Sequence, residues 1–237
     1  GEIRRAAELF ERQLATAGEI GDRRNESNAL GGLGLTQYVM GESRAAAQLF
    51  NQQLAITREI GDRRGEAAAL SNLGNACATL EYTPQAIAYH EQALTIAREM
   101  SDRRAEATAL GGLGVAEYLA GDIPRSVELL EAQLKLTREI HDLRGEALAL
   151  GNLGEARIVA GAPEAAIDPL KQAYQVAHQI GDLQAQANAR FHLAIALDRT
   201  GDRPQAVCEA ENALELFRLA DHPAADTVRK QLQAWQA

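Results

Sequence analysis

The stretch REIGDRRGEAAALSNLG, residues 58–74, decides the fold, because its two characteristic segments return along the chain at a constant spacing. The turn segment Gly61-Asp62 has counterparts before it at Gly21-Asp22 and after it at Ser101-Asp102. Related turn segments start at residues 21, 61, 101, 141 and 181, and Leu-x-x-Leu-Gly segments start at residues 30, 70, 110 and 150. No insertion interrupts this spacing. The sequence is therefore built from a 40-residue repeat.

Each period contains the signals of two helices. Gly61 suits the left-handed residue that ends one helix, and Asp62 suits the N-cap of the next. Leu73 and Cys77 follow helical spacing in the first helix, and Pro84 suits the first turn of the second. Each hairpin then has two helices of about 18 residues, about 27 Å long. One hairpin cannot bury its own apolar faces, so neighbouring hairpins must stack.

Composition narrows the class of protein. Hydrophobic residues make up 46% of the chain but aromatic residues only 4%, which suits close-packed helices better than a β sandwich. The net charge of -9 repels phosphate, so we expect no nucleic-acid partner. No run of apolar residues approaches the roughly 18 needed to span a bilayer, and the start of the chain does not resemble a signal peptide. We expect a cytoplasmic protein with no membrane partner, in which Cys77 and Cys208 are small buried residues.

The residues within one repeat resemble the tetratricopeptide repeat signature. Leu73-Gly74 in the first helix, Ala86 twelve residues after that glycine, and Ala93-Leu94 carry the resemblance, which covers essentially the whole chain. It implies an all-α fold, namely a right-handed superhelix or α-solenoid of antiparallel helical hairpins, with a C-terminal capping helix. The 40-residue period is similar to that of kinesin light chains, of Pins-type polarity adaptors and of the sensor arrays of bacterial signal-transduction ATPases with numerous domains.

The phase of the repeat divides the chain. Residue 1 stands in the phase of Gly41, so we expect the first repeat to lack its first helix and the chain to come from a longer array. Apolar surface beside Leu14 would then be exposed, which would permit homo-oligomers through the array ends. At the other end, Leu232 and Trp235 are expected to cover the last repeat. The expected segments are a half repeat (1–20), full repeats (21–60, 61–100, 101–140, 141–180 and 181–220) and a capping helix (221–237).

The resemblance also implies where a ligand binds. In this family the first helices of successive repeats line a concave groove that holds a protein or peptide. An asparagine amide offers both a donor and an acceptor, and therefore suits the main chain of an extended peptide. The alternative is that these asparagines bridge neighbouring helices or face water. The residues that the resemblance places in the groove are Asn28, Tyr38, Asn72, Asn75, Tyr118, Asn152, Glu155, Asn188 and His192.

Two further periodic features each have more than one interpretation. Paired glycines at residues 31–32 and 111–112 each cost about 1 kcal/mol per glycine in a helix interior. Either a neighbouring side chain or a ligand approaches the backbone there, although duplication of a two-repeat unit also explains their period of 80. Arginines follow the turns, with glutamates at fixed offsets. These charges indicate either ion pairs between repeats, worth about 0–1 kcal/mol each, or an edge that docks an acidic partner. The arginines are Arg23, Arg24, Arg63, Arg64, Arg103, Arg104 and Arg144.

Residue patterns typical of catalysis or cofactor binding are not found. The five histidines lack metal-ligand spacing, and the GGLG strings lack the Lys-Ser/Thr of a phosphate-binding loop. His90 replaces an apolar core residue, and we expect it to be packed with its nitrogens hydrogen bonded. The sequence predicts a non-catalytic module without metal or cofactor: the ligand- or partner-sensing array of a larger bacterial regulator. A constitutive scaffold, a self-assembling adaptor and a signalling-peptide receptor are the alternatives.

Overall fold

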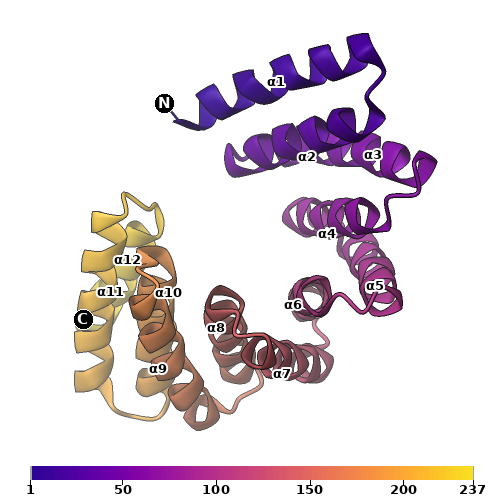
Figure 1. Ribbon diagram of the computed structural model, residues 1–237. Helices are drawn as coiled ribbons and strands as arrows, with labels where there is room; N and C mark the ends of the chain where they lie inside the picture. The colour runs from indigo at the N-terminus through magenta and orange to yellow at the C-terminus, as the bar shows by residue number, and fades with distance from the viewer. Residues whose placement is uncertain (1, 237) are drawn as a thin grey trace. The chain divides into compact units, whose positions relative to one another are not determined.

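The computed structural model describes residues 2–236, and within that range it contains twelve helices that pack as sequential pairs (Figure 1). They form two compact units, Gly1–Gly121 and Asp122–Ala237, which we call the N-terminal and the C-terminal unit. The N-terminal unit contains α1 (Glu2–Ile20), α2 (Arg23–Val39), α3 (Ser43–Glu59), α4 (Arg63–Thr79), α5 (Thr83–Glu99) and α6 (Arg103–Ala120). The C-terminal unit contains α7 (Ile123–Glu139), α8 (Leu143–Val159), α9 (Pro163–Gln179), α10 (Leu183–Arg199), α11 (Arg203–Leu219) and α12 (Ala224–Gln236).

A turn with a left-handed residue follows each of these helices except the last. Gly61 has φ of +68°, as the sequence predicts, and glycine occupies this place in seven of the eleven turns between the described helices. The other four turns place Glu81, Ser101, His141 and Asp221 there, at φ between 49° and 62°. A residue with a Cβ atom pays roughly 1–2 kcal/mol for this conformation. Packing of the flanking helices therefore holds the turn even where glycine is missing.

Aspartates cap the first helix of each hairpin. An Asp62 side-chain oxygen accepts a hydrogen bond from the backbone N–H of Gly65 at 3.0 Å, as its position in the sequence predicts. Such a cap stabilises a helix by about 1 kcal/mol because it satisfies one of the unpaired N–H groups at the helix start. The equivalent caps are Asp22, Asp102, Asp142 and Asp182.

Small residues set the close approach of the two helices in a hairpin. Ala86 is fully buried, and a Cβ atom added to Gly74 would lie 2.4 Å from the His90 ring. The same test places a Cβ on Gly154 at 2.4 Å from Leu170 in the C-terminal unit. Real Cβ contacts are never this short, so each of these positions requires glycine. The leucine-glycine segments of the sequence thus mark the crossing points of the helices.

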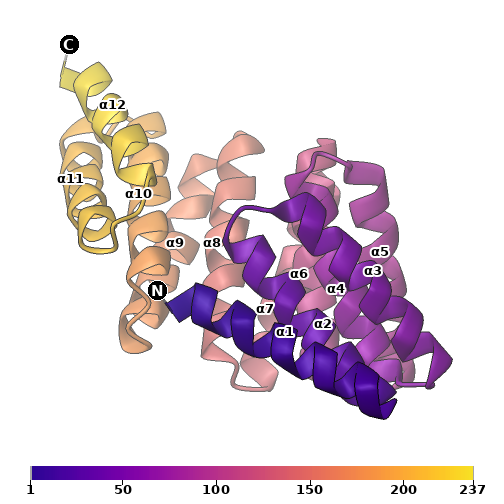
Figure 2. The ribbon, with the colours of Figure 1, turned by 90° about the horizontal axis from the view of Figure 1, so that it is seen from above.

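The last helix covers the end of the C-terminal unit. Val228 and Leu232 of α12 are buried with Phe217 of α11 in one apolar cluster, and Trp235 is half-buried against it. The guanidinium of Arg203 lies over the Trp235 ring at 5.6 Å from its centroid. Figure 2 shows α12 beside α10 and α11. Leu232 and Trp235 therefore make the contacts that the sequence predicts for them.

Two expectations about buried residues need correction. Cys77 is buried, as predicted, and burial raises the pKa of its thiol, but Cys208 is exposed on α11. His90 is only 1% exposed, as predicted, yet its Nδ1 has no hydrogen-bond partner among residues 2–236. The ring lies against glycine backbone on two helices, Gly74 of α4 and Gly112 of α6. Burial lowers the pKa of His90 to about 4, because the charged imidazolium would lose its hydration.

None of the helices described here is long and apolar enough to cross a lipid bilayer.

Candidate functional site

The first helix of each hairpin in the N-terminal unit has one face whose residues are exposed or half-buried, with Gly32 and Gly112 half-buried against the rings of Phe10 and His90. On α2 this face consists of Asn28, Gly32, Leu35 and Val39, which are spaced to lie on one side of a helix and are exposed or half-buried. The equivalent positions on α4 and α6 are open in the same way. We call the twelve residues together the N-terminal stripe; the others are Ala68, Asn72, Asn75 and Thr79 on α4, and Thr108, Gly112, Val115 and Leu119 on α6.

The C-terminal unit has the corresponding face on α8 and α10. All of its residues are exposed or half-buried. We call this set the C-terminal stripe: Leu148, Asn152, Glu155 and Val159 on α8, and Asn188, His192, Ile195 and Arg199 on α10. The residues predicted from the sequence lie on these two stripes, except for Tyr38 and Tyr118, which occupy the position before the last stripe residue of α2 and α6.

The asparagines of the two stripes differ from the other asparagines of the chain. The amide of Asn25 donates to the Asp22 carboxylate, and those of Asn51 and Asn212 donate to carbonyls of their own helices. The stripe asparagines make no side-chain hydrogen bond to any residue within 2–236; they are Asn28, Asn72, Asn75, Asn152 and Asn188. The alternative that these amides bridge neighbouring helices is therefore wrong. Their donors and acceptors are left for water or for a ligand.

Tyr38 joins two helices instead of standing free in a groove. Its hydroxyl lies 3.0 Å from Oγ1 of Thr79, and the Thr79 hydroxyl donates to the carbonyl of Asn75 at 3.1 Å. Since that donation uses the only threonine proton, the tyrosine O–H is the donor of the pair. Tyr38 thus ties the end of α2 to the end of α4 beside the N-terminal stripe.

The paired glycines are explained by neighbouring side chains. A Cβ atom on Gly32 would lie 2.3 Å from the Phe10 ring, and one on Gly112 would lie 2.2 Å from the His90 ring. Gly31 faces Gln53 in the same way, at 2.6 Å. A side chain from a neighbouring second helix therefore occupies the space that a Cβ atom would need. Between a neighbouring side chain and a ligand, the neighbouring side chain accounts for Gly31, Gly32 and Gly112.

Glu155 and His192 meet across the C-terminal stripe. The carboxylate oxygen Oε2 lies 3.9 Å from Nε2 of the imidazole, so the pair joins α8 to α10. Burial lowers the pKa of His192, and the charge of Glu155 opposes this shift without overcoming it. The imidazole is therefore neutral at pH 7, and the local charge at this point of the stripe is that of the carboxylate.

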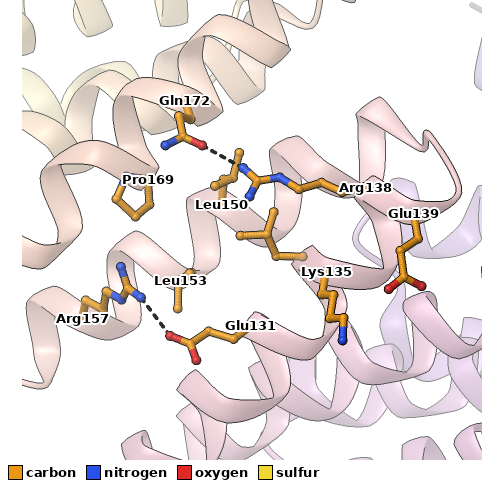
Figure 3. A pocket seen from close by; sticks show the side chains of 10 residues that line it. Glu131, Lys135, Arg138, Glu139, Leu150, Leu153, Arg157, Pro169 and Gln172 are labelled. Carbon is orange, nitrogen blue, oxygen red and sulfur yellow. Dashed lines mark hydrogen bonds and ion pairs between the residues drawn. The ribbon is translucent and has the colours of Figure 1, made fainter.

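A hollow of about 480 Å³ opens between α7 and α9, with α8 beneath it (Figure 3). Leu150, Leu153 and Pro169 contribute its apolar lining. Arg138 donates to Gln172 at 2.7 Å on one side, and Arg157 donates to Glu131 at 2.8 Å on the other.

A similar hollow of about 420 Å³ is lined by Leu14, Leu30 and Gln52 in the N-terminal unit. These residues stand 120 positions before Leu134, Leu150 and Gln172, which line the hollow between α7 and α9. The hollow therefore belongs to the geometry of the repeat, in the groove between consecutive second helices.

Arg157 compensates for the proline inside α9, through a hydrogen bond that sequence reasoning missed. Proline has no N–H, so Pro169 inside α9 leaves the carbonyl of Ala165 without its helical donor. Arg157 of α8 donates to that carbonyl at 2.9 Å and replaces the missing bond. The signal was present in the sequence, since Pro169 stands in a column with Leu49, Tyr89 and Leu129. Proline there requires a compensating donor, and only the structure identifies it.

The recurrent arginines form ion pairs within and between hairpins. Arg63 bonds to Glu66 of its own helix at 2.6 Å and also to Glu99 at the end of α5. Arg58 of α3 donates to Glu66 of α4 at 2.8 Å and so joins consecutive hairpins. Although burial raises the pKa of Glu66, the hydrogen bonds from the two arginines outweigh it and lower that pKa. Both Arg63 pairs lie within one repeat, whereas Arg58–Glu66 joins two repeats, as does the pair of Arg64 with Asp102 at 3.1 Å. The prediction of ion pairs between repeats is confirmed for Arg64.

Among residues 2–236, no three His, Cys, Asp or Glu side chains gather closely enough to hold a metal ion.

Hairpins that recur with a constant period and present the same face from every first helix define an α-solenoid repeat protein. Tetratricopeptide repeat models match residues 69–104 and 105–179 of the sequence. Residues 69–179 are therefore similar to tetratricopeptide repeats, and the helices of the chain pack in sequential pairs as in a solenoid of that type. A search of the curated proteins found no match.

Three solved structures show how widely the fold is shared. A Rap protein complexed with competence and sporulation factor has a TM-score of 0.75 at 15% identity, over 99% of this chain and 70% of that one. Kinesin light chain repeats of Podosopora anserina have a TM-score of 0.65 at 17% identity, over 82% of this chain and 95% of that one. The signal-transduction ATPase with a tetratricopeptide repeat sensor from Pyrococcus horikoshii gives 0.76 at 18% identity, over 93% of this chain but 33% of that one. At these identities the likeness is one of fold.

Proposed function

We propose that the chain is a non-catalytic module that binds an extended polypeptide along the stripes of its first helices. The observation that carries this proposal is the set of five stripe asparagines without a side-chain hydrogen bond within residues 2–236. Elsewhere in the chain, Asn25, Asn51 and Asn212 have found partners. An asparagine amide matches one peptide unit, because it donates to a carbonyl and accepts from an N–H.

Exposed apolar side chains support the same face. Leu35, Val39 and Leu119 are 48%, 66% and 51% exposed on the N-terminal stripe, and Leu148 and Val159 are 52% and 49% exposed on the C-terminal stripe. Large apolar groups gathered on one face mark sites of interaction with other molecules. Amides for a ligand's main chain and aliphatic surface for its side chains thus lie on the same helices.

We further propose that binding serves as the sensing step of a larger bacterial regulator. Similar folds occur in a signal-transduction ATPase with a repeat sensor and in a Rap protein complexed with a factor of competence and sporulation. Each repeat contacts only its neighbours, so small changes at each interface add up along an array. A ligand bound to several first helices would bias those interfaces together.

The test begins with peptides selected from a random 15-residue display library on the immobilised chain. The enriched peptide is then labelled with fluorescein, and its Kd is measured by anisotropy. A hydrogen bond contributes about 1 kcal/mol net, so loss of two amides should weaken binding about tenfold or more. The variants are Asn72→Ala with Asn75→Ala, and Asn152→Ala with Asn188→Ala. Asn51→Ala is the control, because its amide bonds to the Ala47 carbonyl on a second helix.

An unchanged Kd in both double variants would contradict the binding face. A constitutive scaffold is the second candidate, favoured by the likeness to the kinesin light chain repeats. Small-angle scattering with and without the selected peptide separates the two, since a sensor changes its scattering profile on binding and a scaffold keeps it.

A further inference from the structure

The N-terminal stripe contains no ionisable side chain. Its twelve positions carry asparagine, threonine, glycine, alanine, leucine and valine, in a chain of which 24% is Asp, Glu, Lys or Arg. The charged residues of the same helices stand mainly in the first turn, such as Arg63 and Glu66 on α4. The second helices carry others, such as Arg58 and Glu59 on α3. Charge is therefore missing from the twelve positions, although the exposed Arg24, Arg64 and Arg104 stand one turn before Asn28, Ala68 and Thr108 on the same face.

The repeat itself does not forbid charge at these positions. The C-terminal stripe occupies the same columns and carries Glu155 and Arg199. Asn75 and Glu155 stand in one column, and Thr79 and Arg199 stand in another. The neutral N-terminal stripe is thus a property of this unit and not a requirement of the fold.

A neutral face discriminates against charged ligands. A charged side chain that docks on the twelve positions, away from the arginines at the helix starts, loses hydration and meets no opposite charge in return, which costs free energy. An uncharged segment loses little hydration free energy on this face. Its apolar side chains cover Leu35, Val39 and Leu119, and its main chain forms hydrogen bonds with the amides of Asn72 and Asn75. The face therefore fits one class of occupant.

We propose that the N-terminal stripe selects an uncharged, partly apolar stretch of an extended polypeptide. This inference rests on the proposed function and specifies the ligand class at one of its two stripes. It predicts that binding to this stripe depends little on salt, since no charge pairs are formed across the interface.

The test uses the peptides selected from the random library on the full chain. Peptides whose affinity falls tenfold or more in the variant with Asn72→Ala and Asn75→Ala are assigned to the N-terminal stripe. Their sequences are read for charge, and Kd is measured at 50 mM and 500 mM NaCl. We expect uncharged central segments and less than a twofold change of Kd with salt.

A matched pair of variants gives an independent readout. Ala68 and Thr108 are exposed stripe residues, and Thr108→Lys with Ala68→Lys should enrich acidic peptides in a repeated selection. Asn51→Lys on a second helix is the control and should leave the selected sequences unchanged.

Each outcome decides the matter. Charged peptides with a strongly salt-dependent Kd at this stripe would overturn the inference and leave the proposed function intact. Peptides that depend on neither pair of asparagines would overturn the proposed function and this inference with it. Sedimentation velocity tests whether a second copy of the chain occupies the face. A concentration-dependent dimer that Leu35→Ser and Leu119→Ser abolish would show this and would also overturn the inference.

Discussion

The two units differ in how each buries a polar residue at a position that the repeat usually fills with an apolar one. In the N-terminal unit, His90 stands in the column of Phe10 and Phe50, and its Nδ1 has no partner within residues 2–236. In the C-terminal unit, Arg190 stands in the leucine column of residues 30, 70, 110 and 150. It bonds to Glu209, and its guanidinium lies 4.0 Å from the centroid of the Tyr174 ring.

This difference shows what the repeat frame tolerates. A neutral imidazole fits an aromatic site without a hydrogen-bond partner at Nδ1, because it carries no charge and packs against glycine. A guanidinium always carries its charge, so it needs a carboxylate nearby. The column of Glu209 holds leucine, tyrosine and proline in earlier repeats, so both members of the pair depart from the repeat together. The following predictions test this contrast.

The largest expected effect is a loss of stability in acid that depends on His90. Its pKa is lowered from 6.5 to about 4 in the folded chain, so the unfolded chain binds more protons between these values. The contribution of His90 to the free energy of unfolding is complete above pH 6.5 and is lost as pH falls through 4. The loss from pH 7 to pH 4 is about 3 kcal/mol. Urea unfolding across this range measures it.

The control for this prediction is His90→Phe. Phenylalanine fits, because Phe10 already faces Gly32 as His90 faces Gly112. Carboxylates titrate in the same range in both proteins, so the difference between their pH profiles isolates the histidine. Parallel profiles for the two proteins would show that His90 does not keep a lowered pKa.

A smaller effect is expected when the partner of Arg190 is removed. Glu209→Ala leaves a mostly buried guanidinium unpaired, since the two side chains are 20% and 17% exposed. Breaking a fully buried pair costs about 3–5 kcal/mol, and this partly exposed one should cost about 2 kcal/mol. The second change Arg190→Leu restores the residue of the other first helices and should recover most of the loss. Chemical denaturation of both variants measures the recovery, and equal stability of the single and double variants would contradict the compensation.

The sequence predicts the frame of the molecule better than its site. The turns, the aspartate caps and the crossing at Gly74 follow from single residues with strong local preferences, which repetition makes visible. The partners of polar side chains do not follow from local preference. Neither the unpaired Nδ1 of His90 nor the bond from Arg157 to the Ala165 carbonyl is visible in spacing, because both depend on which helix lies opposite.

The same limit applies to the candidate site. The family resemblance predicts which columns hold the stripe asparagines, and the structure leaves those positions open to solvent. Their amides lack hydrogen-bond partners within residues 2–236, and this depends on which side chains lie nearby in the folded chain. The alternative in which they bridge helices was equally compatible with the sequence.

The smallest expected effect concerns the compensation within the C-terminal unit at Pro169. Arg157→Met removes the donor to the Ala165 carbonyl and also the bond to Glu131. In a Pro169→Ala background the N–H of residue 169 returns and bonds to the same carbonyl, so only the Glu131 bond is lost. The arginine substitution should therefore cost about 1 kcal/mol more in the natural chain than in that background. Urea unfolding of the four proteins gives this coupling directly, and the Glu131 term cancels between the two backgrounds. A coupling near zero would mean that water satisfies the Ala165 carbonyl as well as Arg157 does, and that the proline in α9 needs no partner.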